Sequence, residues 1–306
     1  MNDLGPQSPS DNPFTARMRL HQSWYRASVL GVPCGTGPRP ASTKHYGNML
    51  RREDGARGLN FLTPVIFEVA RARLAKARGV VEPFRLLHNM LSSQPMCFNL
   101  FGPLVMDLDL ATLLMRQLLP GEVQRVTAVK IEHAPAPASE YLDDSTAFDA
   151  FVEYARSDGS EGFVGVETKL TEPFSHKHYD RPTYRRWMKD GRGPWRDDAW
   201  FEVSKTPHNQ LWRDHLLAVA TLRRARSKYT HGALMLVRHP GDRSCDKIVR
   251  RYQGLLCAGA DTFIDVPLDD LVKRFGRAEL QPDARSWLAA FEQRYLRLAE
   301  SAAVRT

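Results

Sequence analysis

The chain has few cysteines and no long apolar segment. Its 306 residues include four cysteines, which form no Cys-x-x-Cys pair: Cys34, Cys97, Cys245 and Cys257. This scattered spacing excludes a zinc site built on paired cysteines and a disulfide scaffold. No run of about 18 apolar residues, as a membrane-spanning helix requires, is present. We therefore expect a protein of the reducing cytoplasm that does not associate with membranes.

The N-terminal segment lacks the basic and then apolar pattern of a signal peptide. Residues 1–13, MNDLGPQSPSDNP, are polar, and we expect them to form a disordered lead. The full chain is 42% hydrophobic, enough to bury a substantial core, and we expect one domain over residues 14–300.

The chain is basic, with 43 Lys and Arg against 35 Asp and Glu and a net charge of +8. Such a balance favours an anionic partner. It is also common in proteins with no nucleic-acid role, so charge alone decides little.

Residues 146–171 have the pattern of two strands joined by a tight turn. The segments 147–154 and 162–170 are rich in Phe, Val and Tyr, and Ser157-Asp158-Gly159-Ser160 separates them. Side chains alternate between the two faces of a strand. One face is therefore predicted to be apolar and to pack against the core: Phe148, Ala150, Val152, Tyr154, Val164, Val166, Thr168 and Leu170.

The opposite face of this hairpin carries Asp149, Glu153, Glu167 and Lys169. A slip of one residue would bury Asp149 and Glu167, so the apolar pattern predicts a register that places Asp149 opposite or diagonal to Glu167. Two adjacent carboxylates repel each other unless a hard cation lies between them, and such oxygen ligands suit Mg²⁺ or Mn²⁺. Lys169 points the same way and could hold a water molecule or a developing phosphorane charge.

This arrangement resembles the active hairpin of the PD-(D/E)XK, restriction-endonuclease-like nuclease superfamily. That hairpin has an Asp in one strand and Glu-x-Lys in the next, here Asp149 and Glu167-Thr168-Lys169. No other acidic-x-Lys triplet occurs in the chain, although the Pro that often precedes the Asp is replaced by Phe148. The alternative is an ordinary cross-strand charge pair. Together with SSQPMCFNLFGPL and NQLWRDHLLA, the hairpin extends the resemblance over about residues 85–240, to an uncharacterised bacterial family of this superfamily.

The resemblance implies an α/β fold with a central mixed sheet, helices on both faces, and extra N- and C-terminal helices. It also implies metal-dependent hydrolysis of phosphodiester bonds, with DNA as the favoured substrate and a homodimer left open. Asp149 and Glu167 would bind the metal, and Lys169 would position or help deprotonate the attacking water. Gln210 would orient water or backbone, its alternative being a helix-capping role. Two alternatives to a nuclease stay open. The chain could be an inactive nucleic-acid-binding protein of the same fold, or an assembly module.

Supporting residues are harder to assign, because the helix before the catalytic sheet contains no acidic residue at the place where such families often have one. Gln94 or Asn99 would take the place of this acidic residue. Alternatively, the buried polar residues of this segment would only satisfy hydrogen bonds within the core. Glu132 and Glu153 are further candidates, from the first strand and the hairpin.

Residues 172–205 are rich in basic and aromatic side chains and have no clean period, so we expect a loop or irregular insertion beside Lys169. Tyr184, Trp187 and Trp195 would stack on bases or anchor the loop. The alternative is a solvated loop without substrate contacts. The predicted phosphate contacts are Lys177, Arg185, Arg186, Arg192 and, from the next helix, Arg213.

The other elements follow from apolar periodicity and from helix-start signals. Thr206-Pro207 is predicted to open the helix that carries Gln210, and Gly102-Pro103 the second of two helices within 84–117. Residues 31–43 are predicted to be a loop. The expected strands are 126–133, 231–237 and 262–266, and the other expected helices are 14–30, 61–77, 244–256, 267–275 and 283–299.

Overall fold

The computed structural model describes residues 3–39, 41–76, 81–189 and 193–302, which form two compact units. The described residues of the first unit lie within 3–76, 81–103 and 272–302, and those of the second within 104–271. No helix among the described residues is long and apolar enough to cross a membrane. The expected single domain over residues 14–300 stays a prediction.

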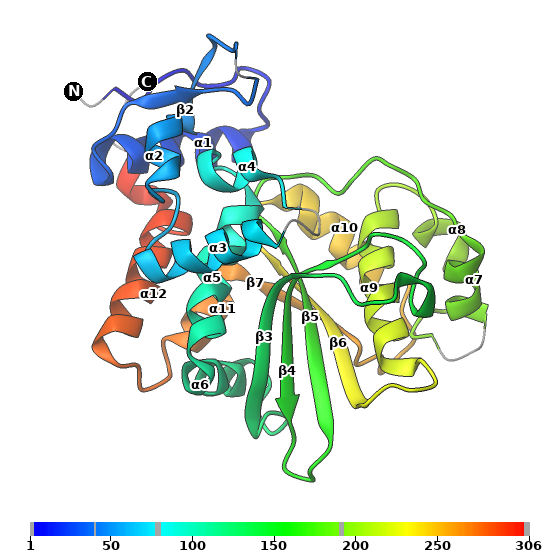
Figure 1. Ribbon diagram of the computed structural model, residues 1–306. Helices are drawn as coiled ribbons and strands as arrows, with labels where there is room; N and C mark the ends of the chain where they lie inside the picture. Colours follow the sequence, from blue (N-terminus) through cyan, green and yellow to red (C-terminus); the bar gives the residue numbers. More distant parts are fainter. Residues whose placement is uncertain (1–2, 40, 77–80, 190–192, 303–306) are drawn as a thin grey trace. The chain divides into compact units, whose positions relative to one another are not determined.

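A five-stranded mixed sheet forms the centre of the second unit (Figure 1). Its strands lie in chain order: β3 (Arg125–His133), β4 (Phe148–Ala155), β5 (Glu161–Lys169), β6 (Tyr229–Arg238) and β7 (Phe263–Pro267). β3, β4 and β5 pair antiparallel, whereas β5, β6 and β7 pair parallel. The parallel strands are joined through α9 (Asn209–Arg223) and α10 (Arg243–Gln253), as crossover connections require. The mixed α/β fold predicted from the sequence is confirmed.

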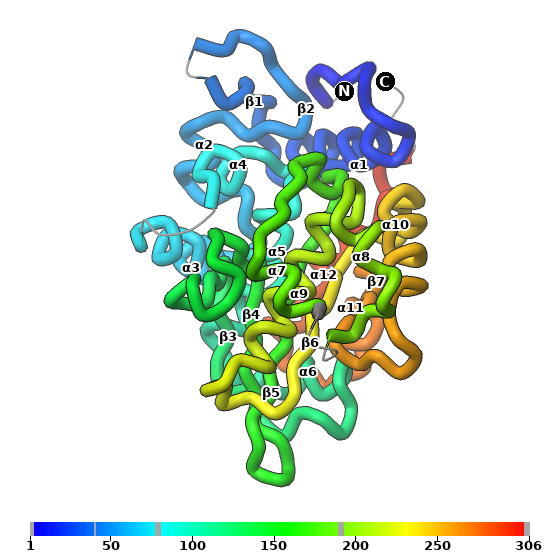
Figure 2. The backbone as a smooth tube through the Cα atoms, turned by 90° about the vertical axis from the view of Figure 1, so that its right-hand side faces the viewer, coloured from blue at the N-terminus to red at the C-terminus, as the bar shows by residue number. Residues whose placement is uncertain are grey.

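Helices flank both faces of this sheet (Figures 1 and 2). On one face α9 buries Leu211, Trp212 and Leu216 in a core that also includes Phe151 and Phe163 of the hairpin. α6 (Leu108–Leu118) lies against β3, and its buried Ala111, Leu114, Met115 and Leu118 follow helical spacing. The second unit also contains α7 (Pro182–Lys189), α8 (Trp200–Val203) and the first half of α11 (Leu268–Phe275).

The first unit consists of helices and a small sheet. Its two strands, β1 (Cys34–Thr36) and β2 (His45–Leu50), pair antiparallel. β1 falls within residues 31–43, so the loop predicted there is wrong in part. The other elements that lie wholly in this unit are α1 (Pro13–Trp24), a π-helical turn (Tyr25–Val29), α2 (Arg52–Ala56), α3 (Pro64–Ala75), α4 (Pro83–His88), α12 (Pro282–Tyr295) and a 3₁₀ turn (Leu298–Ser301).

Pro103 does not start a helix, and the prediction that it does is wrong: it lies inside α5 (Ser93–Met106). A proline has no N–H to donate to the carbonyl four residues earlier. The carbonyl of Asn99 instead accepts from Trp287 Nε1 at 2.8 Å, which gives it a partner despite the proline. The next helix, α6, begins after Asp107, whose Oδ1 accepts from the backbone N–H groups of Asp109 and Leu110.

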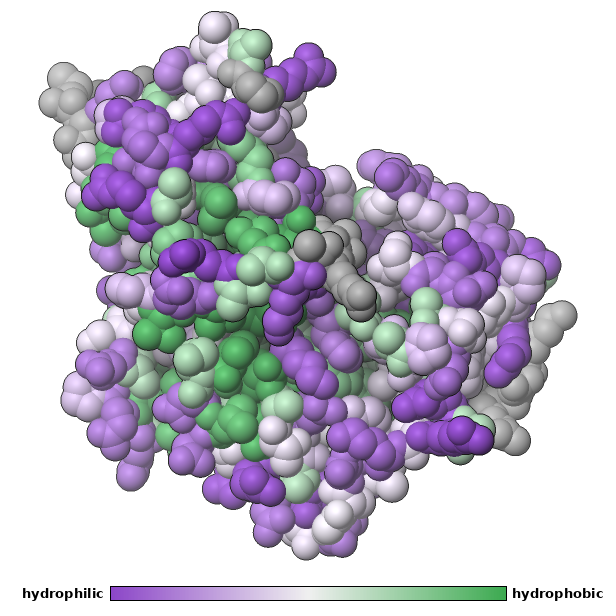
Figure 3. Space-filling model, viewed as in Figure 1, coloured by the Kyte–Doolittle hydropathy of each residue, from purple (hydrophilic) through white to green (hydrophobic). Residues whose placement is uncertain are grey.

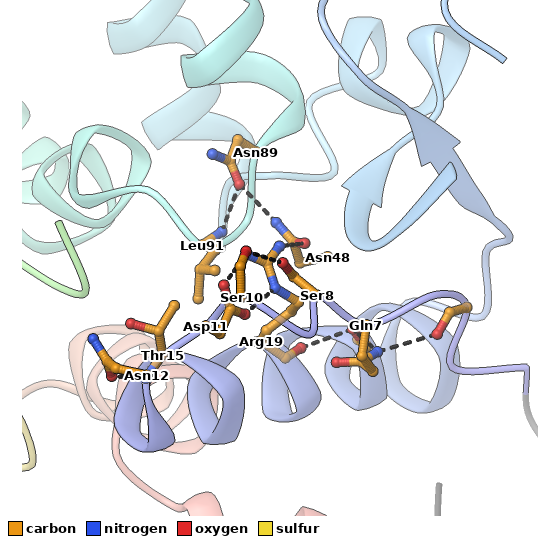
Figure 4. Close-up of polar contacts among 12 residues, drawn as sticks. Gln7, Ser8, Ser10, Asp11, Asn12, Thr15, Arg19, Asn48, Asn89 and Leu91 are labelled. Atoms are coloured by element: carbon orange, nitrogen blue, oxygen red, sulfur yellow. Dashed lines mark hydrogen bonds and ion pairs between the residues drawn. The ribbon is translucent and has the colours of Figure 1, made fainter. Parts of the chain in front are cut away.

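Residues 3–12, predicted to be a disordered lead, make hydrogen bonds with α1 and β2 (Figure 4). Arg19 binds both oxygens of Asp11, at 2.5 and 3.0 Å, and also contacts Asn48 Oδ1. Asn48 in turn donates to Asn89 Oδ1 at 2.8 Å. Gln7 Nε2 donates to Ser23 Oγ at 3.1 Å. The partners lie far from one another in sequence, so local composition did not reveal them.

Both faces of the hairpin are buried, which corrects the expectation of one core face and one charged face. Phe151 and Phe163 lie on the face of Glu167 and are 1% and 0% exposed, because α9 covers this face. Phe148 also packs on it: its ring stacks with Phe151 at 5.4 Å and lies over Gly165, where an added Cβ would be 2.3 Å from the ring. The placement of Phe148 with Ala150 is therefore wrong, because Gly165 leaves room for the ring on the other side.

Candidate active site

Three carboxylates lie in a row across β3, β4 and β5. Ile131 pairs with Ala150 and His133 with Phe148, which puts Glu132 opposite Asp149. The pairing of Ala150 with Val166, continued by one residue, puts Asp149 opposite Glu167. Residues directly opposite in antiparallel strands are close neighbours on one face of the sheet. The expected position of Asp149 relative to Glu167 follows from this register.

Asp149 is held by the residue that follows Glu167. Its Oδ2 accepts hydrogen bonds from the backbone N–H of Thr168 at 2.8 Å and from the Thr168 hydroxyl at 2.7 Å. Thr168 was predicted to face the apolar core, but its hydroxyl bonds the carboxylate instead. These two bonds orient Asp149 toward the end of β5 where Lys169 lies.

Glu167, Lys169 and Gln210 form a closed triangle of polar side chains. Lys169 Nζ lies 3.1 Å from Glu167 Oε1 and donates to Gln210 Oε1 at 3.2 Å. Gln210 Nε2 donates to the same Glu167 oxygen at 2.9 Å. Gln210 Oε1 also accepts from the backbone N–H of Ser175 at 2.8 Å, which ties the segment after β5 to the triangle. The Gln210 amide thus bonds the hairpin rather than capping its own helix.

The sequence predicted that α9 begins at Pro207, but the helix begins at Asn209. His208 is its N-cap residue. Gln210 is still in the first turn, so it reaches the hairpin. Lys169 is buried at 7% exposure, and its ammonium also lies 5.0 Å from the centre of the Phe174 ring. The charged group of Lys169 is therefore held between three side chains.

Asp214 is a fourth carboxylate near this cluster, and the sequence analysis missed it. It follows Gln210 by four residues on α9, so the two side chains share a helix face. It is 6% exposed, and its Oδ2 has no hydrogen-bond partner among the described residues. The charges that act on it include those of Lys169 and Asp149. The spacing from Gln210 was the one signal in the sequence that could have identified it.

Burial raises the pKa of each of Asp149, Glu167 and Asp214 to about 7. The negative charge of Glu167 raises the pKa of Asp149 further, whereas Lys169 opposes the rise at Glu167. Glu132 adds to the negative charge around Glu167 and has a left-handed backbone, φ 55°, which is uncommon for a residue other than glycine. Carboxylates therefore outnumber the two cations that act on them, Lys169 and Arg213.

The pKa of Lys169 is raised despite its burial. Burial by itself would lower this pKa, but the carboxylates of Glu167, Asp214 and Glu172 outweigh it. Lys169 therefore stays protonated at neutral pH, with its hydrogens available for donation.

The donor chemistry of Asp149 and Glu167 fits a hard divalent cation. Their hydrogen bonds use Asp149 Oδ2 and Glu167 Oε1, which leaves Asp149 Oδ1 and Glu167 Oε2 outside these bonds. Within the described ranges, no three His, Cys, Asp or Glu side chains form a group that could hold a metal ion. Mg²⁺ is commonly bound through one or two carboxylates with water completing its shell, so two donors are sufficient for this ion.

The supporting roles predicted for Glu153, Asn99 and Gln94 stay predictions, and the structure gives the contacts of the first two. Glu153 is held by Tyr229, by Lys130 at 3.1 Å and by Lys228 at 3.2 Å. Burial would raise the pKa of Glu153, but these partners outweigh it and lower the pKa to about 2. Asn99 lies in the first unit, where it accepts from the N–H of Leu62 at 2.8 Å and donates to Tyr295 at 2.9 Å. Gln94 lies in the same unit.

Residues 172–205 are not wholly irregular, because they contain α7 and α8. Tyr184 and Trp195 are 0% and 6% exposed and bond Asp144 and Tyr252 respectively, so both anchor the segment to the core. Arg213 is also engaged: it bonds Thr146 Oγ1 at 2.5 Å and lies 4.3 Å from the centre of the Tyr179 ring.

The remaining predicted phosphate contacts lie at the surface. Lys177, Arg185 and Arg186 are exposed. Arg185 pairs with Asp180, and its guanidinium lies 4.9 Å from the centre of the Trp200 ring. Arg192 lies outside the described residues.

Comparison with known proteins rests on one finding. Searches of curated proteins and of solved structures found no match. The family model described as PD-(D/E)XK nuclease superfamily matches residues 9–297, a longer stretch than the 85–240 over which the sequence motifs resemble that superfamily. Because this match covers nearly the whole chain and includes the hairpin and α9, the protein belongs to the PD-(D/E)XK nuclease superfamily.

Proposed function

We propose that the protein is a metal-dependent nuclease that hydrolyses phosphodiester bonds in DNA at a site formed by Asp149, Glu167, Lys169 and Gln210. The observation that carries this proposal is the triangle of Glu167, Lys169 and Gln210 beside Asp149, in a chain of a nuclease superfamily. All four residues lie in one unit and come from the hairpin and from the first turn of α9.

Asp149 and Glu167 are the proposed ligands of Mg²⁺ or Mn²⁺. When bound, such an ion polarises the phosphate and lowers the pKa of a coordinated water, so no covalent enzyme intermediate is needed. Thr168 fixes the orientation of Asp149, and Gln210 fixes that of Glu167. Pre-set ligand orientation of this kind supports metal affinity.

Lys169 is proposed to position rather than deprotonate the attacking water. Its raised pKa disfavours a role as a general base at neutral pH. A protonated ammonium can instead donate to the water or to a phosphate oxygen that gains charge in the transition state. Gln210 and Phe174 hold this ammonium in place.

An inactive nucleic-acid-binding protein is the second candidate. It is favoured by one observation: among the residues described, no three potential ligands form a metal-binding group. Incubation of the purified protein with linear, circular and single-stranded DNA, with Mg²⁺, with Mn²⁺ and with a chelator, separates the two candidates. Cleavage that requires metal supports the nuclease, and binding without cleavage under every condition supports the inactive protein.

Metal binding is expected to stabilise the protein at pH 8. The carboxylates have ordinary pKa values near 4 when unfolded and about 7 when folded, so the metal-free protein loses stability as the pH rises through this range. A cation that binds both carboxylates relieves their repulsion and adds about 2.7 kcal/mol at 100 times its Kd. Thermal unfolding with and without Mn²⁺ measures this gain.

Asp149→Asn is the matched variant for this measurement. It removes one charge of the pair without changing the size of the side chain, so it should raise the unfolding midpoint of the metal-free protein and lose the gain from Mn²⁺. An equal Mn²⁺ gain in the variant would show that the ion binds elsewhere.

Asp214→Asn tests whether Asp214 acts through Lys169. The Asp214 carboxylate raises the pKa of Lys169, so its loss should move the alkaline limb of the kcat profile to lower pH while leaving kcat at pH 7 within a few-fold of the parent value. The Mn²⁺-dependent gain in stability should be retained if Asp214 is not a ligand. A kcat profile with an unshifted alkaline limb would contradict the proposed role.

A further inference from the structure

A cavity of about 530 Å³ in the second unit is lined by four arginines. It lies between the turn Ala138–Glu140, α7, and the end of α9 with the residues that follow. None of the four proposed catalytic residues lines it. The lining residues are Ser139, Glu140, Arg186, Trp187, Arg223, Arg224, Ala225 and Arg226. The volume is in the range of sites that hold a small ligand or part of a larger one.

The lining carries an excess of positive charge. Glu140 is its one acidic residue and pairs with Arg224 at 2.8 Å, so the formal charges of the lining sum to +3. Arg186, Arg223 and Arg226 are exposed. Guanidinium groups match the geometry of phosphate oxygens and bind them through paired hydrogen bonds. A phosphate group would therefore relieve the repulsion between these arginines.

A purely structural explanation accounts for part of this cluster only. Cations are favoured near the C-terminus of a helix, which explains Arg223 and Arg224 at the end of α9. It does not explain Arg186, which comes from α7, or Arg226, which follows the helix. Arginines from two segments of the chain, α7 and the end of α9 with the residues that follow it, thus line one cavity.

Trp187 does not offer a free stacking surface in this cavity. Its Nε1 donates to the carbonyl of Tyr141 at 3.0 Å, and the guanidinium of Arg186 lies 5.5 Å from the centre of its ring. The groups that remain to contact a ligand are guanidinium groups and one serine. The cavity is therefore suited to phosphate and not to the recognition of bases.

We infer that this arginine cavity binds a backbone phosphate of the nucleic-acid substrate at a distance from the cleavage site; the inference rests on the proposed function. Gln210 and Arg223 lie at opposite ends of α9, thirteen residues apart, which corresponds to about 20 Å. A single DNA strand advances about 3.4 Å per nucleotide along the duplex, so this distance corresponds to about six base pairs. The contact anchors long substrates without reading their sequence.

The test uses Arg223→Gln combined with Arg226→Gln, in the full chain carrying Asp149→Asn so that DNA is not cut. Both arginines are exposed, and the double variant should keep its thermal stability. We expect about tenfold weaker binding of a 30-base-pair duplex and a salt dependence flatter by about two phosphate contacts. A control variant, Lys273→Gln with Arg277→Gln, removes the same charge from exposed positions outside the cavity lining.

Duplex length and a free anion distinguish the sources of phosphate. A four-base-pair duplex, about 14 Å long, should bind the arginine variant and the control equally, because it is too short to reach both places. Equal binding of the long duplex by the two variants would overturn the inference. The inference would also be overturned if pyrophosphate stabilised the parent protein through these arginines but their loss left binding of the long duplex unchanged.

Failure of the proposed function gives a different result. If the chain without Asp149→Asn cuts no DNA under any metal condition but the arginine variant still loses long-duplex binding, the cavity is supported and the nuclease assignment is not. If cutting is observed and long-duplex binding is unchanged in the arginine variant, the nuclease assignment stands and the cavity is not an anchor.

Discussion

Asp149→Asn and Glu167→Gln are each expected to reduce kcat for DNA cleavage by about a thousandfold or more. Each change removes one negative charge from the proposed pair of metal ligands while it keeps the size of the side chain. Groups that act as one catalytic unit show losses of this order when a single member is removed. Rates of cleavage of labelled DNA with saturating Mg²⁺ or Mn²⁺ measure the effect.

Lys169→Met separates metal binding from catalysis. The variant keeps most of the apolar stem but lacks the ammonium that contacts Glu167 and Gln210. It should lose cleavage by a similar factor and still show the Mn²⁺-dependent gain in thermal stability, because it retains both carboxylates.

Glu161→Gln is the control for these three variants. Glu161 lies at the other end of β5, where it pairs with Lys228, so its replacement should leave kcat within about twofold of the parent rate. Robust cleavage by Asp149→Asn, measured beside this control, would rule out the assigned site.

We expect His215 to make the free energy of unfolding fall steeply as the pH drops below 6.5. This residue is 0% exposed: its Nδ1 lies 2.8 Å from the Tyr252 hydroxyl and its Nε2 2.9 Å from the Thr262 hydroxyl. Burial lowers the pKa of His215 to about 3, and a hydrogen bond at Thr262 opposes this shift only in part. The unfolded chain, with its ordinary pKa near 6.5, therefore takes up a proton that the folded chain does not.

The sign of this effect follows from proton linkage. The lowered folded-state pKa contributes stability above pH 6.5, and this contribution is lost at about 1.4 kcal/mol per pH unit as the pH falls toward 3. His215→Gln keeps hydrogen-bonding atoms in the core and removes the titrating group. The difference between the free energies of unfolding of the two proteins should thus change by about 1.4 kcal/mol per unit between pH 6 and 4. A constant difference over this range would show that His215 is protonated in the folded protein.

Alternation of apolar residues was sufficient to predict the hairpin and to exclude a slip of one residue. Burial of Val152, Val164 and Val166 on one face requires Asp149 to lie opposite or diagonal to Glu167, and the observed pairing puts it opposite. The structure agrees because this pattern is local and involves two strands joined by a short turn. The same local information predicted that Gln210 would lie near the start of a helix, although the first helical residue is Asn209.

Contacts between distant segments were not predictable in this way. The position of the Phe148 ring depends on the missing side chain of Gly165, which lies on the neighbouring strand. Pro103 is accommodated within α5 because Trp287, far along the chain, bonds the carbonyl that a proline cannot satisfy. In each case the deciding partner is distant in sequence, so local propensity gave the wrong result.

The sequence by itself therefore determined the residue types of the candidate site, the strands that carry them and the α/β class. Only the tertiary structure decided which other charges join them. Asp214 reaches the cluster because α9 packs over the hairpin, and the arginine cavity exists because α7, the turn at Ser139 and the end of α9 meet. Side-chain alternation is a property of a strand alone, whereas the burial and the pKa of a carboxylate depend on everything packed around it.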